Sequence, residues 1–321
     1  MEQIPGYRLI DRIGEGGMAT VYKGLQLSLN RPVAIKILQK KLADHSTVLE
    51  RFKRESLIIN PNIIHVIDRG ITEEGMPYFV MEYVEGIDLE YAMKAGDLDF
   101  NRKVDLVIQI CKALSYAHKN GVIHRDIKPS NVLIDGEGNV QVLDFGIAQF
   151  YKNENKDFQR TLVGSIMGTP DYMSPEQQYS ADNVTNLSDL YSLGVITYEL
   201  FTGARPIGRF KLPCEIDSNI PEPLQDIIIS CLEPDPADRP ASADDIKDRL
   251  LKLLRGAHLK IDQKNRASQG IYDIKEKFAL LDVIKEEHHG APVLWRPSSS
   301  HHLGIKTSPI SSGHPKMTRL S

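Results

Sequence analysis

The first quarter of the chain is a succession of short runs rich in β-branched and aromatic residues, from residue 7 to about residue 84. The clearest runs are residues 33–37 (VAIKI) and 78–84 (YFVMEYV), whose composition is typical of β-strands. Between them, residues 46–59 change to helical spacing, which is carried by Val48, Phe52, Glu55 and Ile59. The pattern predicts a small sheet accompanied by one helix.

Helical periodicity takes over beyond Gly86. Residues 189–201 are apolar on nearly every side and predict a buried helix, and residues 242–255 form an amphipathic helix that we expect to end at Gly256. Two apolar runs, 132–134 and 140–143, flank the turn-forming sequence DGEGN and predict a β-hairpin. One further helix is predicted by a core-facing stripe of Val104, Val107, Ile108, Cys111 and Leu114.

The chain changes character after Gly256. Residues 272–287 fit an amphipathic helix with Ile274, Phe278, Leu281 and Ile284 on one face. We expect this segment to dock on the preceding domain or to bind a partner chain, with a solvated appendage as the alternative. Residues 288–321 are rich in Ser, His, Pro and Gly and contain basic but no acidic residues, which predicts a disordered basic tail.

Composition limits the class of protein. A formal net charge of −4 over 321 residues gives no overall attraction to nucleic acid. The cysteines, Cys111, Cys214 and Cys231, are too widely spaced for a disulfide framework or a zinc site of paired cysteines. The N-terminus does not resemble a signal peptide, and no apolar stretch approaches the ~18 residues that span a bilayer. We therefore expect a soluble cytoplasmic protein with no membrane span and no nucleic-acid partner.

A glycine-rich segment, residues 14–21 (GEGGMATV), lies between two strand-like runs. Glycines let backbone N–H groups approach phosphate oxygens without interference from a Cβ atom. Taken alone, this segment is as typical of an ordinary glycine-rich hairpin as of a phosphate-binding loop.

Lys36 ends an otherwise apolar strand, where an ammonium group without a partner is costly to bury. A carboxylate would offset that cost, and Glu55 follows on the predicted helix. The two side chains either form an ion pair or both extend to solvent.

The densest group of polar side chains is residues 124–131 (HRDIKPSN), in a loop between a helix and the hairpin. Reactive groups often collect in loops on a rigid scaffold. Asp126 can accept a hydroxyl proton, and Lys128 can neutralise phosphate charge. Asn131 and Asp144, which begins the sequence DFG after the hairpin, can offer oxygen ligands to Mg²⁺. Composition alone favours the alternative of a solvated polar loop.

Together and in this order, these segments resemble the signature motifs of protein kinases, from about Tyr7 to Arg255. The chain is most similar to bacterial serine/threonine kinases of the eukaryotic type, also called Hanks-type kinases. This similarity is carried by residues 16–19 (GGMA), 168–170 (GTP), 174–177 (SPEQ), 188–194 (SDLYSLG) and 238–240 (DRP).

The resemblance implies a two-lobed α+β kinase fold. A small antiparallel β N-lobe with one helix would occupy residues 1–84, a mainly α-helical C-lobe residues 85–255, and an extension residues 256–321. It also implies transfer of the γ-phosphoryl group of ATP to Ser or Thr hydroxyls of protein substrates, with Mg²⁺ or Mn²⁺. The implied ATP-binding residues are Ile13, Gly14, Gly16, Val21, Ala34, Lys36, Glu55, Met81, Glu82 and Val84.

The same resemblance implies the catalytic and metal-binding roles. Asp126 would orient the substrate hydroxyl and accept its proton, while Lys128 would neutralise the transferring phosphoryl group. Asn131 and Asp144 would ligate the metal ion. Because Lys128 follows Asp126 by two residues, the resemblance points to Ser/Thr rather than Tyr specificity.

Structural and regulatory roles are implied as well. Glu176 would pair with Arg239 to anchor the C-lobe, and Asp189 would brace the catalytic loop. Arg125 precedes Asp126, which indicates control by phosphorylation of the segment between Asp144 and Glu176. The candidate phosphorylation sites are Thr161, Ser165 and Thr169, with ordinary exposed hydroxyls as the alternative.

One departure from the family pattern follows Glu55, where the chain reaches Pro61 about one helical turn early. We hypothesise that basal activity is low for this reason. A pseudokinase that binds nucleotide as a scaffold is a second candidate function, although Lys36, Asp126 and the two metal-binding residues are all present. A small-molecule phosphotransferase is a third, opposed by the peptide-binding segment at residues 168–176.

Overall fold

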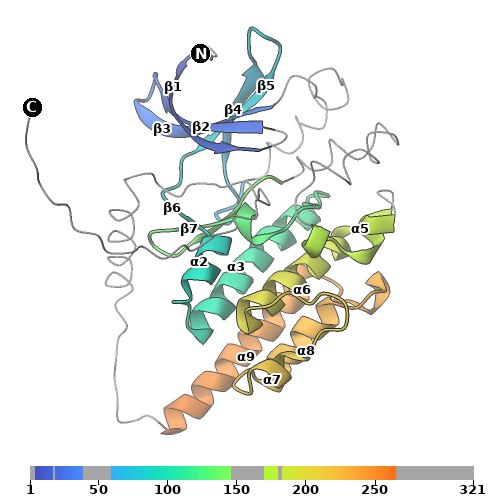
Figure 1. Ribbon diagram of the computed structural model, residues 1–321. Helices are drawn as coiled ribbons and strands as arrows, with labels where there is room; N and C mark the ends of the chain where they lie inside the picture. The colour runs from blue at the N-terminus through green and yellow to red at the C-terminus, as the bar shows by residue number, and fades with distance from the viewer. Residues whose placement is uncertain (1–3, 17–18, 39–58, 146–169, 180–182, 265–321) are drawn as a thin grey trace, which may run out of the picture.

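The computed structural model describes residues 4–16, 19–38, 59–145, 170–179 and 183–264. These residues form a small lobe of strands and a larger lobe of helices (Figure 1), which confirms the expected α+β class. Within the described residues, none of the helices combines the length and apolar character needed to cross a bilayer. Several sequence-based candidates lie outside the described residues: Glu55 and nearly all of the predicted helix at 46–59, the hydroxyls of Thr161, Ser165 and Thr169, and residues 272–287.

The N-lobe is one antiparallel sheet in the order β1-β2-β3-β5-β4. The side chains of Val33 and Ile35 in the third strand, and of Val80 beside them, are fully buried. Burial of each such side chain contributes roughly 2 kcal/mol, so the middle of the sheet is its most stable part. The strands are β1 (Tyr7–Glu15), β2 (Ala19–Gln26), β3 (Arg31–Leu38), β4 (Val66–Ile71) and β5 (Pro77–Glu82).

A second, three-stranded sheet begins the C-lobe and contains the predicted hairpin. Strand β6 (Gly86–Asp88) pairs with β7 (Val132–Asp135), which pairs with β8 (Val140–Val142). The carboxylate of Asp135 accepts the backbone N–H groups of Glu137 at 2.9 Å and Asn139 at 2.7 Å, so the turn is closed by its own first residue.

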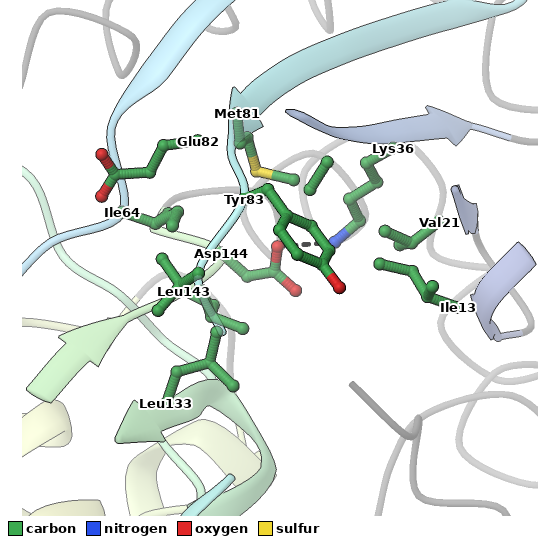
Figure 2. Close-up of a pocket in the computed structure, with 12 residues that line it drawn as sticks. Ile13, Val21, Lys36, Ile64, Met81, Glu82, Tyr83, Leu133, Leu143 and Asp144 are labelled. Carbon is green, nitrogen blue, oxygen red and sulfur yellow. Dashed lines mark hydrogen bonds and ion pairs between the residues drawn. The ribbon is translucent and has the colours of Figure 1, made fainter. Parts of the chain in front are cut away.

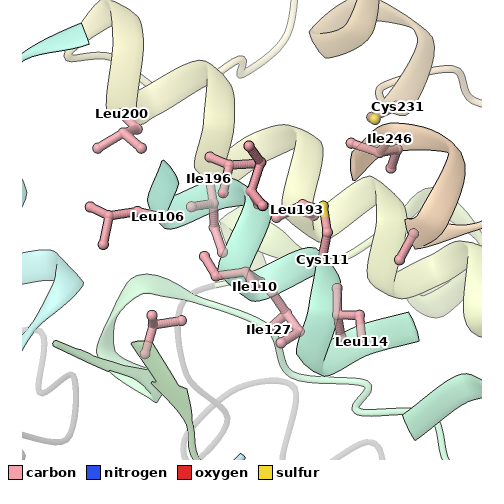
Figure 3. Packing of buried hydrophobic residues seen from close by; sticks show 14 of the residues in the cluster. Leu106, Ile110, Cys111, Leu114, Ile127, Leu193, Ile196, Leu200, Cys231 and Ile246 are labelled. Atoms are coloured by element: carbon pink, nitrogen blue, oxygen red, sulfur yellow. The ribbon is translucent and has the colours of Figure 1, made fainter. Parts of the chain in front are cut away.

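The C-lobe core is built around helix α3, which packs against α6, α9 and strand β8 (Figure 3). All five residues of the predicted stripe in α3 are buried, as are most residues of α6, so both predictions are confirmed. Figure 3 shows Ile110, Leu114 and Ile127 meeting beneath the residues of α6. The helices are α2 (Leu89–Ala95), α3 (Phe100–Lys119), α5 (Pro175–Tyr179), α6 (Asn186–Thr202), α7 (Pro213–Ile216), α8 (Glu222–Cys231) and α9 (Ala243–Lys264), with 3₁₀ turns at Pro129–Asn131, Pro170–Tyr172 and Pro236–Asp238.

The expected end of the last helix at Gly256 is wrong. Helix α9 continues through this glycine to Lys264. A glycine within a helix costs only about 1 kcal/mol relative to alanine, and the residues that follow, AHLK, include strong helix formers. The small cost of Gly256 is therefore not enough to end the helix when the residues after it favour helical structure.

A buried polar contact joins the two lobes in addition to the chain itself. Asn62, just before β4, donates from Nδ2 to Gln109 Oε1 at 3.1 Å and to the carbonyl oxygen of Val140 at 2.9 Å. The backbone N–H of Val142 donates to the Asn62 carbonyl, and that of Ile64 donates to the Val142 carbonyl. The N-lobe is thereby fixed to α3 and β8, directly behind the cleft.

Candidate active site

A pocket lies between the lobes and is lined by both sheets (Figure 2). Its lining is apolar except for Lys36, Glu82, Asp144 and the hydroxyl of Tyr83, and Lys36 and Asp144 bring opposite charges together at one end. Seven expected ATP-binding residues line this pocket: Ile13, Val21, Ala34, Lys36, Met81, Glu82 and Val84. Gly14 lies in β1 and Gly16 directly after it, where its N–H donates to the Ala19 carbonyl at 2.9 Å; neither glycine is among the lining residues.

Sequence reasoning missed three lining residues, Ile64, Leu133 and Leu143. Tyr83 also lines the pocket, and it lies within the segment from Glu82 to Val84 that the resemblance implies as the adenine-binding hinge. Apolar side chains carry no chemical signal of their own. Leu143 could have been found because it directly precedes Asp144, and Leu133 because it lies two residues after Asn131 in the alternating hairpin.

Lys36 and Asp144 meet at the charged end of the pocket. Nζ of Lys36 donates to Oδ1 of Asp144 at 2.6 Å, and the two side chains are 6% and 16% exposed. Figure 2 shows both pointing into the same space. An ion pair this shielded from water is electrostatically strong, and it holds a cation and a carboxylate where a polyphosphate and its metal ion would need them.

Asp126 is held by two neighbours in residues 124–131, the expected catalytic loop. Lys128 Nζ lies 2.8 Å from Oδ2 of Asp126, and Asn131 Nδ2 donates to the Asp126 backbone carbonyl at 2.8 Å and to Oδ2 at 3.3 Å. The Asp126 side chain remains 39% exposed. Its carboxylate is therefore oriented by the fold but open to an incoming hydroxyl group.

His124 connects this loop to the segment that carries Asp144. The ring is fully buried, and its Nε2 lies 2.6 Å from the carbonyl oxygen of Leu143. Nδ1 accepts the backbone N–H of Asp126 at 3.2 Å. Because a carbonyl can only accept, Nε2 donates its proton to Leu143, and Nδ1 offers its lone pair to the backbone N–H of Asp126. The His124 ring also packs edge to face against Phe145, the residue after Asp144, with 4.7 Å between the ring centroids.

Asp189 holds the catalytic loop from below. Its two carboxylate oxygens accept the backbone N–H groups of His124 at 2.8 Å and Arg125 at 2.7 Å, and His118 Nε2 lies 2.8 Å away. The carboxylate is 1% exposed.

Arg125 and Asp144 both have left-handed backbone conformations, with φ of 68° and 59°. Such conformations cost of order 1–3 kcal/mol, and here the surrounding hydrogen bonds compensate for them.

Asn131 and Asp144 offer a donor set that fits a divalent cation. The N–H of Leu143 donates to the Asn131 carbonyl at 2.8 Å, which holds the residue before Asp144 against Asn131. Because Nδ2 of Asn131 faces Asp126, its amide oxygen is oriented away from that carboxylate. One carboxylate and one amide oxygen are hard ligands, and small divalent cations are typically held by so few protein groups when phosphates supply the rest.

Glu176 and Arg239 form a bidentate ion pair in the C-lobe. The two guanidinium–carboxylate contacts are 2.7 and 2.8 Å, and the Arg239 side chain is fully buried. Burial alone raises the pKa of Glu176, but hydrogen bonds from Arg239 and Ser188 lower it to about 2. Arg239 also donates to the carbonyls of Leu187, Glu233 and Pro234, so the pair ties three segments together.

A second cavity, of about 630 Å³, adjoins the catalytic loop on the C-lobe side. Lys128 and Ser130 form one wall, and α2 and the end of α6 form the others. Among the residues that line the cavity, the Tyr172 hydroxyl donates to Glu199 at 2.5 Å, and burial raises the pKa of Glu199. Arg205 is paired with Asp171 at its edge. The cavity is large enough for several side chains and lies within one lysine's length of Asp126.

Comparison with known proteins agrees with this geometry. The chain matches the protein kinase domain family over residues 7–251. It is 38% identical over 278 residues to a probable serine/threonine-protein kinase of Clostridium perfringens, which covers 81% of this chain and 40% of that protein. It is 35% identical over 300 residues to the serine/threonine-protein kinase PrkC of Bacillus subtilis, covering 88% and 45%, and 38% identical over 272 residues to the serine/threonine-protein kinase pkn3 of Myxococcus xanthus, covering 76% and 49%.

The chain thus spans less than half the length of these curated relatives. The similarity to bacterial Hanks-type kinases that its motifs indicated is confirmed, and the family match covers most of the chain. This chain belongs to the protein kinase family.

Proposed function

We propose that this chain is a serine/threonine protein kinase that transfers the γ-phosphoryl group of ATP to Ser and Thr hydroxyls of proteins. The observation that supports this most directly is a pair of ionic contacts: Lys36 with Asp144 at the charged end of the pocket, and Asp126 with Lys128 in the loop that Asn131 joins to the residue before Asp144. Phosphoryl transfer depends on positioning and charge neutralisation more than on covalent catalysis, and these four groups provide both.

In the proposed reaction, Asp126 orients the substrate hydroxyl and accepts its proton. The contacts from Lys128 and Asn131 fix the carboxylate before the substrate arrives, so less orientational freedom is lost during the reaction. Lys128 also lies where it can neutralise charge on the group in transfer. Lys36 neutralises phosphate charge on the nucleotide side.

We assign Mg²⁺, or Mn²⁺ in its place, to the ligands Asn131 and Asp144. The bound ion supplies positive charge to the phosphate oxygens. Asp144 would offer a carboxylate and Asn131 an amide oxygen to the ion.

The substrate polypeptide lies across the second cavity in this proposal. Lys128 both lines the cavity and contacts Asp126. An extended chain advances about 3.3 Å per residue, so a substrate residue two or three positions from the acceptor hydroxyl at Asp126 can reach the cavity. Hydroxyls between Asp144 and Glu176 are proposed as autophosphorylation targets. Since ATP is the donor, the cytoplasm is the proposed place of action.

The test is incubation of the purified chain with labelled ATP and a generic basic protein, with and without Mg²⁺. We expect label on phosphoserine and phosphothreonine after acid hydrolysis, and loss of that label when the metal is chelated. Bound nucleotide without transfer to any acceptor would instead favour the pseudokinase. Label found only on a small molecule would favour a small-molecule phosphotransferase.

A further inference from the structure

The second cavity contains acidic side chains of the kind that bind a basic substrate residue. Glu90 and Glu199 line it, and Asp171 directly precedes the lining residue Tyr172. Burial raises the pKa of Glu199, and the charge of Glu90 raises it further, so the ionised carboxylate gains from a nearby cation. If these carboxylates were open, a substrate arginine or lysine would be the expected occupant.

Arg205 of the same chain already contacts two of these carboxylates. Its Nη1 is paired with Oδ2 of Asp171, and its Nε lies 3.8 Å from Oε1 of Glu199. The other oxygen of Glu199 accepts the Tyr172 hydroxyl at 2.5 Å. The side chains of Arg205, Asp171 and Glu199 are 35%, 22% and 21% exposed, so their contacts are partly shielded from solvent. Both carboxylates therefore have a cationic partner before a substrate arrives.

The backbone at the end of α6 places Arg205 at the cavity. Gly203 ends the helix in a left-handed conformation, with φ of 74°, and its N–H donates to the Glu199 carbonyl at 2.8 Å. The Thr202 hydroxyl accepts the N–H of Ala204 at 3.3 Å and donates to its carbonyl at 3.1 Å. These contacts turn the chain back on itself, so Arg205 returns to the last turn of α6, beside Glu199.

A basic side chain from a substrate would have to displace Arg205. A group held in the same chain has an effective concentration in the millimolar range, which a dilute substrate does not reach. The guanidinium group also presents its N–H donors in a fixed fork, so it binds carboxylates with less loss of freedom than a lysine does. Arg205 therefore has the advantage over a competing substrate cation.

The rest of the cavity offers no better place for a basic residue. Glu90 is paired with Lys94 at 2.7 Å. Lys103 also lines the cavity, with its ammonium group 5.6 Å from the centroid of the Phe201 ring. Among the described residues, four basic and two acidic side chains form the lining, so it has no excess of negative charge.

We propose that Arg205 determines the substrate specificity of this cavity by occupying the site that a basic substrate side chain would otherwise take. This inference rests on the proposed function, because it concerns the substrate residue two or three positions from the acceptor hydroxyl. Substrates with a neutral or acidic residue there are accepted, and arginine or lysine there gives no advantage. Basic proteins remain acceptors at hydroxyls whose neighbours at that position are not basic.

Peptides test the role of Arg205. Each peptide has one serine in an otherwise neutral sequence, with a single arginine placed two or three residues before or after it, and the reference peptide has alanine there. We expect the wild type to show an arginine-to-alanine ratio near 1 at every position. Arg205→Met should raise this ratio about tenfold at one position, because a charge-assisted pair then forms with Asp171 and Glu199.

Two measurements give this ratio: kcat/KM for phosphoryl transfer, and equilibrium binding of the labelled peptides by fluorescence anisotropy. Arg205→Gln, which keeps a donor but removes the charge, should show the same gain and serves if Arg205→Met does not fold. Adding Glu199→Gln to either variant should remove most of the gain. Arg209→Met, at an exposed position of the same loop that does not line the cavity, should behave as the wild type.

The outcomes separate this inference from the proposed function. Equal ratios in the wild type, Arg205→Met and Arg205→Gln would overturn the role of Arg205. A tenfold preference for arginine already present in the wild type would also overturn it, because the cavity would then accept a basic side chain with Arg205 in place. Absence of transfer to every peptide would count against the kinase function alone, since the binding ratios still decide the role of Arg205.

Discussion

Lys36 Nζ lies 2.6 Å from Asp144 Oδ1, although 108 residues separate the two in the chain. One residue belongs to the middle strand of the N-lobe sheet, and the other follows β8 in the C-lobe. Their contact therefore joins the lobes at the charged end of the pocket. A nucleotide bound there would meet a cation from one lobe and, from the other, the carboxylate that we propose as a metal ligand.

Replacing Lys36 by methionine tests this arrangement. Methionine keeps most of the length but removes the charge, so we expect phosphoryl transfer to fall at least about 100-fold, since electrostatic stabilisation is lost at the phosphates. Lys112→Met, on the exposed side of α3, is the matched control and should keep full activity. Transfer rates measured with labelled ATP give the comparison. Unchanged turnover in a folded Lys36→Met variant would remove Lys36 from the proposed mechanism.

The Glu176–Arg239 pair gives a prediction about pH. Because the pKa of Glu176 is about 2 in the fold and about 4.5 when free, its ionisation stabilises the fold above about pH 4.5, and this contribution is lost as pH falls toward 2. We expect Glu176→Gln to lower the free energy of unfolding by about 3 kcal/mol at pH 7, because Arg239 is left buried without its partner.

The difference between wild type and Glu176→Gln should shrink as pH falls below about 4.5. Urea unfolding at a series of pH values measures it. Glu222→Gln, at an exposed position of α8, should cost little at any pH. A difference independent of pH would show that the loss comes from packing and not from the charge of Glu176.

Gly194 marks the closest approach of α6 and α8. A Cβ added there would lie 2.6 Å from Cβ of Cys231, which is far below normal contact. We therefore expect Gly194→Ala to destabilise the fold by about 1–3 kcal/mol, although alanine favours a helix. Gly136→Ala is the control, because no atom lies within 4 Å of its added Cβ and its φ is not positive. Thermal unfolding compares the two, and equal melting temperatures would contradict the packing argument.

Much of this site could be predicted from the sequence alone, because the residues expected to carry its chemistry are polar and occur in a recognisable order along the chain. Lys36, Asp126 and Asp144 stood out as ionisable groups in apolar or loop contexts, and the structure brings Lys36 and Asp144 into contact. Secondary structure was predictable where the hydrophobic period was strong, as in α3 and α6. The end of α9 was not, because the effect of Gly256 depends on the residues after it.

Other features depend on tertiary contacts that no local pattern reports. Asn62 and Gln109 are 47 residues apart, and each looks like an ordinary polar residue in its own segment. Leu133 and Leu143 line the pocket only because two sheets converge there. The exposure of Phe210 could not be inferred from sequence, because it depends on how the loop packs against Tyr198.

The central claim is that Asp126 prepares a hydroxyl group for phosphoryl transfer without being needed for nucleotide binding. Asp126→Asn keeps the shape but cannot accept the proton, and Asp226→Asn on the exposed face of α8 serves as its control. The decisive measurement is the single-turnover rate of phosphate transfer to a Ser/Thr acceptor, together with ATP affinity, for both variants. We expect a rate about 10²–10⁴-fold lower for Asp126→Asn with ATP affinity retained, and no change for Asp226→Asn. Transfer by Asp126→Asn at the wild-type rate would contradict the proposed role of Asp126.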